Sequence, residues 1–222
     1  MNAKRQLILA LGLAVAALAP AGAGADTDVV PNPEAQAPAP AFTIGQPAPQ
    51  QDVRMKGVSG TDLSIAEAAG AKGTLVIFTC NHCPWVKMWQ GRIAALGNAA
   101  VEKGIGVIAI NPNDPEQYPE DAYDPMVGQA KALGMKFPYA VDATSEVARA
   151  FGATRTPEAF LFDAKGKLVY HGTVDDNARD EKSVKQPWLR KAVDAVAAGR
   201  SVKPAETKAL GCSVKLREPK SS

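Results

Sequence analysis

Residues 75–87 read LVIFTCNHCPWVK and join a strand signal directly to a helix signal. The run begins inside a continuous β-prone stretch, residues 74–79, which is typical of a strand buried on both faces of a sheet. Beyond the cysteines, apolar side chains recur at helical spacing, at Val86, Trp89, Ile93 and Leu96. The Cys-Asn-His-Cys motif of residues 80–83 is therefore predicted at a strand-to-helix junction.

Two cysteines separated by two residues at the start of a helix place their sulfurs one helical turn apart, a spacing that suits a reversible disulfide. The free N–H groups and the dipole of a helix N-terminus favour a thiolate, and the thiolate is the attacking species. We therefore expect Cys80 to be the nucleophile. Cys83 lies further into the helix and is expected to resolve the mixed disulfide.

The residues around the two cysteines are expected to shape this site. Pro84 fits a first helical turn, where its missing N–H costs little. His82, when protonated, would stabilise the Cys80 thiolate and make the pair more oxidising. Asn81 offers polar contacts without charge. Trp85 is predicted at the rim of the site, whereas Trp89 is predicted in the core.

Strand and helix signals also alternate through the rest of the chain. Residues 52–58 alternate loosely and end in a turn, and residues 111–125 are irregular; their acids indicate a solvated loop or a docking surface. Strands are predicted at 105–110, 138–141, 159–162 and 168–171, and helices at 64–69, 126–133, 145–151 and 188–198. This order predicts an α/β fold, a three-layer sandwich with a central mixed sheet.

Four stretches carry a resemblance to a known family: IGQPAP (44–49), LVIFTCNHCPWVK (75–87), TRTPEAFLFDAKGKLVYHG (154–172) and LGCSVK (210–215). Over residues 42–199 the chain resembles the thioredoxin superfamily, and within it the redoxin or peroxiredoxin-like proteins near the alkyl-hydroperoxide-reductase and TlpA-type groups. The resemblance implies a thioredoxin-like fold with no cofactor. It also implies a cis bond between Thr156 and Pro157, in a loop that lies beside the cysteines and pairs with the substrate backbone.

The chain departs from this pattern at several positions. Thr79 stands where thioredoxin has Trp, and Ile77 stands near the position of thioredoxin's buried acid, so that proton shuttle is missing. The peroxiredoxin pattern P-x-x-x-T-x-x-C is absent, which argues against peroxidase activity. Glu158, after Pro157, is expected either to help proton transfer from Cys83 or to be a solvated strand residue. His171 is expected at the surface or the rim.

The N-terminus has the order of a secretory signal peptide: Lys4 and Arg5, an apolar run over residues 7–18, then small residues up to position 25. Cleavage after Ala23 or Ala25 fits this pattern, and no cysteine lies nearby to take a lipid anchor. We therefore predict a periplasmic or secreted protein without stable membrane insertion. An uncleaved anchor is the alternative, although the run is shorter than the ~20 residues of a membrane span.

Four segments are predicted: a signal peptide (1–25), a Pro/Ala-rich linker (26–41), the thioredoxin-like domain (42–199) and a tail with Cys212 (200–222). The whole chain has 25 Lys and Arg against 23 Asp and Glu, and removal of the signal leaves 23 of each. A neutral domain without a basic cluster argues against nucleic acid as a partner. The expected partners are proteins with thiols or disulfides, or small thiols.

The chain has three cysteines, an odd number, so at least one thiol always lacks an internal partner. Cys212 could be a second resolving thiol, a metal ligand, a dimer link or a bystander. A zinc site is disfavoured because no second ligand pair follows. Copper is the stronger metal alternative, since Cys80, Cys83, His82 and Cys212 are soft ligands. The leading hypothesis remains a thiol–disulfide oxidoreductase; an interaction module without redox activity is the third.

Overall fold

The computed structural model describes residues 42–218, so the predicted signal peptide and linker lie outside the described residues. In chain order the strands are β1 (Met55–Gly57), β2 (Asp62–Leu63), β3 (Gly73–Phe78), β4 (Ile105–Asn111), β5 (Tyr139–Val141), β6 (Arg155–Thr156), β7 (Glu158–Asp163), β8 (Leu168–Gly172) and β9 (Cys212–Ser213). The helices are α1 (Pro84–Glu102), α2 (Tyr123–Ala132), α3 (Glu146–Phe151) and α4 (Trp188–Ala197), with short 3-10 helices η1 (Pro119–Asp121) and η2 (Glu181–Ser183).

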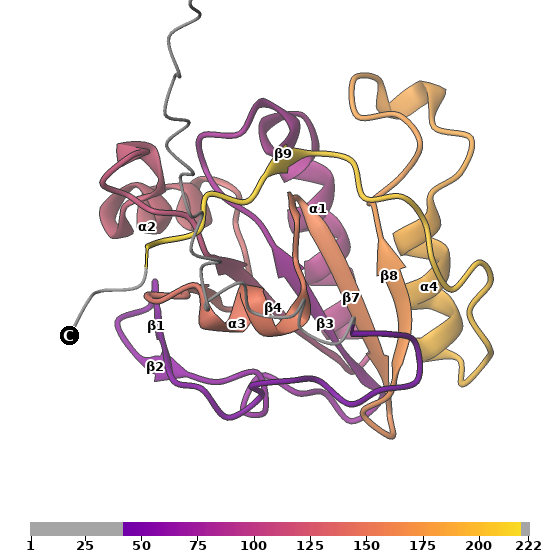
Figure 1. Ribbon diagram of the computed structural model, residues 1–222. Helices are drawn as coiled ribbons and strands as arrows, with labels where there is room; N and C mark the ends of the chain where they lie inside the picture. Colours follow the sequence, from indigo (N-terminus) through magenta and orange to yellow (C-terminus); the bar gives the residue numbers. More distant parts are fainter. Residues whose placement is uncertain (1–41, 219–222) are drawn as a thin grey trace, which may run out of the picture. The chain divides into compact units, whose positions relative to one another are not determined.

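A central mixed sheet of seven strands organises the fold (Figure 1). Its two parts have the orders β2-β1-β5-β4 and β3-β7-β8. They meet where β3 lies against β4, and just beyond β3 the Thr79 N–H donates to the Ile110 carbonyl at 2.9 Å. Strands β4 and β5 pair in parallel, whereas β7 pairs antiparallel with both β3 and β8. The predicted α/β class with a mixed sheet is confirmed.

The apolar residues of β3 alternate between two cores, which explains why the whole strand is buried. Leu75 and Ile77 belong to the cluster that α1 and α4 cover. Val76 and Phe78 belong to the cluster on the other face, which includes Phe151 of α3. Successive strand residues point to opposite faces. A strand covered on both faces therefore reads as an unbroken apolar run, and the result is three layers.

One predicted helix is absent: residues 64–69 form turns. Gly70 explains this difference, because a Cβ there would lie 2.0 Å from the backbone nitrogen of Gly106. The segment is held by this backbone contact and by a hydrogen bond from the Ala66 N–H to the Gln51 carbonyl at 2.9 Å. A helix of six residues forms too few hydrogen bonds to offset the free-energy cost of nucleation. Tertiary contacts therefore decide the conformation of this segment. Among the described residues, no helix is both long and apolar enough to cross a membrane.

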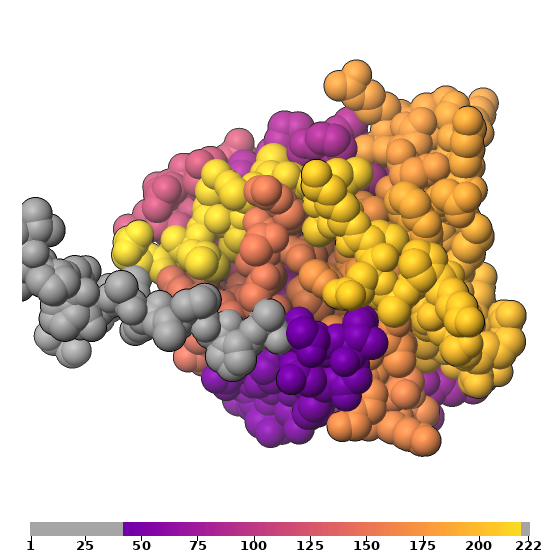
Figure 2. Space-filling model, turned by 45° about the vertical axis from the view of Figure 1, so that its right-hand side comes forward, coloured from indigo at the N-terminus to yellow at the C-terminus, as the bar shows by residue number. Residues whose placement is uncertain are grey.

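After α4 the C-terminal segment runs back across the sheet and forms the short strand β9. It pairs antiparallel with β6, so that Cys212 lies opposite Thr156. Further along, Lys215 donates its N–H to Asn113 Oδ1 at 2.8 Å. The Arg217 N–H donates to Ser145 Oγ at 3.0 Å. Figure 2 shows this segment, in yellow, lying across one face of the molecule. Residues 212–217 are therefore attached to β6 and to the loops that carry Asn113 and Ser145.

Candidate active site

The two motif cysteines lie between the end of β3 and the start of α1. Helix α1 begins at Pro84, with Cys83 as its N-cap residue and the proline in the first turn, as predicted. Cys80 and Cys83 are both 0% exposed. The buried strand before the motif and the proline after it hold the two sulfurs at the edge of the core.

Thr156 contacts both sulfurs. Its hydroxyl lies 3.2 Å from Cys80 Sγ, and its carbonyl oxygen lies 3.3 Å from Cys83 Sγ, within reach of the S–H when that thiol is protonated. The bond between Thr156 and Pro157 is cis, as the resemblance implies. The loop between β6 and β7 thus supplies polar partners to the cysteines from a distant part of the sequence.

Asp121 is the site residue that the sequence analysis missed. It ends η1 within the acidic segment that was predicted to be solvated, yet it is 1% exposed. Its Oδ1 accepts the backbone N–H groups of Asn81 at 2.6 Å and His82 at 3.1 Å. Its Oδ2 accepts from Asn113 Nδ2 at 2.9 Å. Because these donors surround the carboxylate, it fixes the backbone between the two cysteines.

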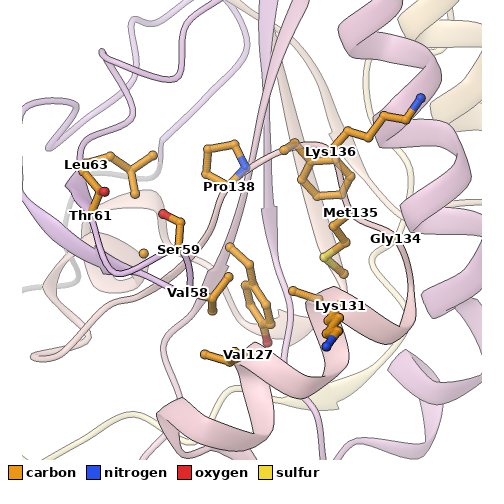
Figure 3. Close-up of a pocket in the computed structure, with 14 residues that line it drawn as sticks. Val58, Ser59, Thr61, Leu63, Val127, Lys131, Gly134, Met135, Lys136 and Pro138 are labelled. Carbon is orange, nitrogen blue, oxygen red and sulfur yellow. The ribbon is translucent and has the colours of Figure 1, made fainter.

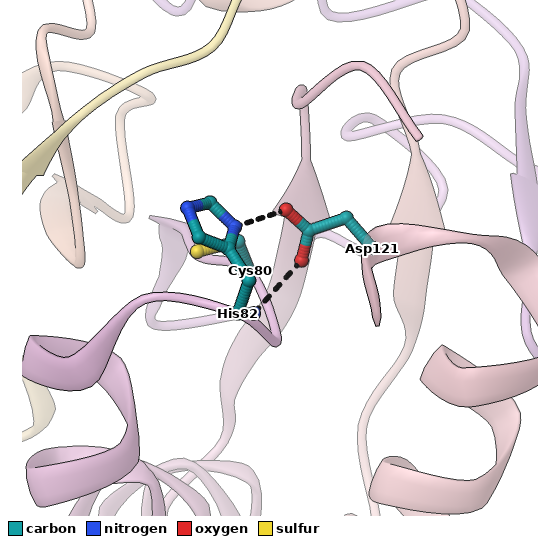
Figure 4. A group of neighbouring side chains, drawn as sticks. All are labelled: Cys80, His82 and Asp121. Atoms are coloured by element: carbon teal, nitrogen blue, oxygen red, sulfur yellow. Dashed lines mark hydrogen bonds and ion pairs between the residues drawn. The ribbon is translucent and has the colours of Figure 1, made fainter. Parts of the chain in front are cut away.

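His82 points at this carboxylate (Figure 4). Its Nδ1 lies 2.5 Å from Asp121 Oδ2, and its ring stacks on Tyr118 with the centroids 4.2 Å apart. The His82 side chain is 13% exposed. The Cys80 sulfur, a His82 ring nitrogen and an Asp121 carboxylate oxygen all lie within 4.8 Å of one another. A buried acid, Asp121, therefore lies beside the two cysteines. It comes from η1, whereas Ile77 occupies the position near which thioredoxin has its buried acid.

The two thiols have oppositely shifted pKa values. Hydrogen bonding from Cys80 and, to a lesser extent, from Cys212 lowers the pKa of Cys83 to about 4. The pKa of Cys80 is raised, first by its hydrogen bond to Cys83, then by burial and by the negative charge of Asp121. This differs from the expectation that the thiolate rests on Cys80. Cys83 is the N-cap residue of α1, where the helix N-terminus favours a thiolate. Asp121, whose negative charge disfavours a thiolate, acts on Cys80.

Titration of the reduced protein should therefore show one thiolate forming near pH 4, seen as an increase in ultraviolet thiolate absorbance. The folded pKa of Cys83 is below the ordinary value of ~8.5. The thiolate thus stabilises the reduced fold fully above pH ~8.5, and this contribution is lost as pH falls through about 4. Cys83→Ser should abolish the low transition, and Cys212→Ser should move it slightly upward. A midpoint near the ordinary thiol value would contradict the assignment.

Asn81 connects the motif to a hollow beside α2. Its Oδ1 accepts from the Tyr139 hydroxyl at 3.0 Å. Burial raises the pKa of Tyr139 well above its ordinary value, so the hydroxyl stays protonated as a donor. Tyr139 also lines a hollow of about 580 Å³ between residues 57–63 and α2, which includes Val58 and Val127 (Figure 3). No cysteine lines this hollow.

Glu158 is buried rather than solvated, being 2% exposed. Its Oε2 accepts the N–H groups of Thr154 and Arg155, each at 2.8 Å. Its Oε1 lies 2.6 Å from His171 Nε2, and the His171 ring stacks on Phe160. Glu158 thus anchors the turn that carries Thr156. Its part in proton transfer from the cysteines stays a prediction.

The tryptophans and the third cysteine complete the surroundings. Trp89 is fully buried and its Nε1 donates to Asp175 Oδ1 at 2.8 Å, which confirms a packing role. Trp85 is 37% exposed, as expected of a rim residue. Cys212 is half-buried and packs against Cys80 and Cys83. All three thiols of the chain therefore meet at one place.

Known proteins share this fold and arrangement of elements. A hypothetical protein from Sinorhizobium meliloti is 35% identical, with a TM-score of 0.74 over 81% of this chain and 98% of its own. A thioredoxin-like protein solved in its oxidized form is 19% identical, with a TM-score of 0.58 over 72% of this chain and 100% of its own, and shows the fold alone.

A curated relative and a family model agree with this fold. Thiol-disulfide oxidoreductase ResA from Halalkalibacterium halodurans is 25% identical over 115 residues, which are 52% of this chain. The match spans 61% of the relative's length. The Redoxin family model matches residues 34–186, well over half of the chain. This chain belongs to the redoxin family, within the thioredoxin superfamily.

Proposed function

We propose that this protein is a thiol–disulfide oxidoreductase in which Cys80 and Cys83 alternate between a dithiol and a disulfide. The observation that carries the proposal is the contact of the two thiols. They lie in one buried cluster, and both sulfurs contact Thr156. Two thiols in one cluster at a helix N-terminus can pair as a disulfide, and the thiolate form of such a pair is the nucleophile.

In the proposed reaction, Cys80 attacks a disulfide of the substrate and expels one substrate sulfur as a thiolate. Cys83 then attacks Cys80 Sγ, which closes the Cys80–Cys83 disulfide and releases the second substrate thiolate. The substrate gains two electrons and the protein loses two. The reverse sequence oxidises a substrate dithiol. Both sulfurs are covered in the reduced protein, so a macromolecular substrate reaches Cys80 only after a covering segment moves.

His82 and Asp121 control the charge beside Cys80 in this proposal. When His82 carries a proton, the imidazolium offsets the Asp121 carboxylate that opposes a Cys80 thiolate. The proton of Cys80 then moves toward Cys83, and the attacking charge moves to Cys80. The pair thus takes the place of the buried acid that Ile77 does not provide.

The proposed substrates are proteins with thiols or disulfides, or small thiols. The activity in the name of the ResA relative supports this class, and so does the absence of net charge in residues 26–222. Peroxidase activity is not proposed, because the peroxide-binding pattern P-x-x-x-T-x-x-C does not occur in the sequence.

A redox titration tests the proposal. The purified protein is equilibrated in glutathione buffers of graded potential, and thiols at residues 80 and 83 are counted by alkylation and peptide mass. We expect one two-electron transition that removes both thiols together, and reduction of insulin disulfides by the dithiol form. A potential near ~−270 mV would indicate a reductant, and one near ~−120 mV an oxidant. Failure of the pair to oxidise would overturn the proposal.

A soft-metal carrier is the second candidate, and the convergence of Cys80, His82 and Asp121 favours it. However, His82 Nδ1 and Asp121 Oδ2 lie only 2.5 Å apart, in a hydrogen bond. Ligands at ~2.0–2.3 Å around one tetrahedral ion lie more than 3 Å from each other, so this bond would have to break. A titration with Cu(I) separates the candidates, since tight stoichiometric binding with no insulin reduction would favour the carrier.

Export to the periplasm or the cell exterior is part of the proposal and rests on the signal-like pattern of residues 1–25. N-terminal sequencing should find the exported protein starting at Gly24 or Asp26. Retention of Lys4 and Arg5 in a membrane fraction would contradict it.

A further inference from the structure

The C-terminal strand brings Cys212 to the motif by a close backbone approach. In the β6–β9 pair, Cys212 lies opposite Thr156, the residue whose carbonyl faces Cys83. Gly211 makes this approach possible, because a Cβ there would lie 2.3 Å from the Thr156 carbonyl oxygen. Since Cβ–oxygen contacts this short do not occur, any larger residue would push the strand away from the cysteines.

Cys83 lies between the other two cysteines. Cys80, Cys83 and Val86 form one buried cluster, and the partly buried Cys212 packs against it. The pairing of Cys212 with Thr156 brings it to the side of Cys83, and the pKa values of Cys83 and Cys212 are each shifted by the other thiol. Cys83 therefore has two thiols within contact, either of which can be its disulfide partner.

We propose that Cys212 is a third redox-active cysteine, which takes the disulfide over from Cys80 by forming a bond with Cys83 and presents it to a dithiol protein at the surface. The inference rests on the proposed function of the Cys80–Cys83 pair. Through Cys212, the buried Cys80–Cys83 disulfide could be reduced by a dithiol protein that does not itself reach these two sulfurs.

The transfer is an internal thiol–disulfide exchange. The Cys212 thiolate attacks Cys83 Sγ in the Cys80–Cys83 disulfide; the bond between Cys83 and Cys212 forms, and Cys80 leaves as a thiolate. The proton lost by Cys212 is matched by the one that Cys80 takes up. The protein as a whole gains and loses no electrons. Cys80 becomes a free thiol while the protein remains oxidised.

The three cysteines differ in their accessibility to a partner protein. Cys80 and Cys83 are 0% exposed, whereas Cys212 is half-buried on the surface-crossing segment. A thiolate of a partner protein can therefore reach Cys212 Sγ first. Its attack breaks the Cys83–Cys212 bond and expels Cys83 as a thiolate, and a second partner thiol then releases Cys212. The partner's dithiol supplies the two electrons that reduce the protein.

The charge distribution favours the same direction of attack. In the step in which the partner attacks Cys212, Cys83 is the leaving group; its pKa is lowered to about 4, chiefly by the hydrogen bond from Cys80, and a sulfur of low pKa is the better leaving group. The pKa of Cys212 is raised to about 11 by burial, and further by the hydrogen bond and the charge of Cys83. In the Cys80–Cys83 disulfide, Cys83 carries no charge. It therefore no longer repels a thiolate on Cys212, and this contribution to the raised pKa of Cys212 is absent.

The first test is a Cys80→Ser variant oxidised in glutathione buffer. The remaining two thiols should both disappear, and peptide mapping should find residues 83 and 212 in one disulfide-linked pair. Two unmodified thiols, or glutathione adducts only, would overturn the proposal. The wild type in the same buffer reports separately on the proposed function, since it must lose the thiols of residues 80 and 83.

The second test measures reduction of the oxidised protein by reduced thioredoxin and, in parallel, by dithiothreitol. Cys212→Ser should form the Cys80–Cys83 disulfide normally but be reduced several-fold more slowly by thioredoxin, with a smaller difference for the small dithiol. Ser213→Ala, an exposed neighbour on the same strand, is the matched control and should behave as wild type. Equal thioredoxin rates for wild type and Cys212→Ser would overturn the surface role of Cys212.

Discussion

Cys80→Ser should abolish the reduction of protein disulfides such as those of insulin, whereas Cys83→Ser should leave Cys80 able to attack and trap mixed disulfides with partners. The reason is the order of the two steps: without the resolving sulfur, the intermediate on Cys80 persists. Non-reducing electrophoresis of cell-envelope extracts, followed by mass spectrometry of the linked cysteine, measures the trapped species. The expected loss of insulin reduction is complete within detection for both variants.

The lower pKa of Cys83 makes this experiment decisive for the direction of attack. If Cys83 were the attacking sulfur, trapped adducts would appear in Cys80→Ser on residue 83 instead. Cys212 contacts Cys83 and could resolve such adducts, so each variant should also be made with Cys212→Ser. Adducts on residue 83 in the Cys80→Ser, Cys212→Ser protein would reverse our assignment of nucleophile and resolving thiol.

Asp121→Leu should lower the free energy of unfolding by roughly 2–4 kcal/mol, because it leaves buried donors without an acceptor and removes the hydrogen-bond partner of the His82 ring. The N–H groups of Asn81 and His82 and the amide of Asn113 all lose their acceptor. Chemical denaturation of the reduced protein measures the effect. The motif backbone should also become mobile, so that thiol exchange slows.

Two variants make this prediction specific. Asp121→Asn keeps an oxygen for Asn81 and His82 and should destabilise the protein less than the leucine variant. Glu120→Leu changes the exposed neighbour in the same short helix and should stay within about 0.5 kcal/mol of wild type. A similar loss for the leucine variants at 120 and 121 would mean that the buried carboxylate has no special role.

The local parts of this site could be predicted from sequence because each depends on neighbours in the chain. The β-prone run before Cys80 and the helical spacing after Pro84 placed the motif at a strand-to-helix junction, where the structure has it. The alternation of strand and helix signals was likewise enough for the fold class. Ser64 to Ala69 was predicted wrongly as a helix, because the contact of Gly70 with Gly106 has no local signal.

Asp121 and Cys212 could not be placed from sequence for the same physical reason. Asp121 lies among exposed acids such as Glu120, and only the three-dimensional course of the loop buries one carboxylate and leaves the other in solvent. Cys212 reaches the motif through a two-residue strand, too short for any periodic pattern. Both depend on contacts between distant segments, whose partners composition and spacing do not specify.

The position of β9 far after the motif in the sequence also affects biosynthesis. Cys80 and Cys83 leave the ribosome, or the export channel, well before Cys212, because a chain emerges from its N-terminus. Until residues 212–213 emerge, Thr156 lacks its partner strand and the two thiols lack Cys212 as a neighbour. We therefore expect a period during synthesis in which the reactive sulfurs are more open to foreign oxidants, and it ends when β9 pairs with β6.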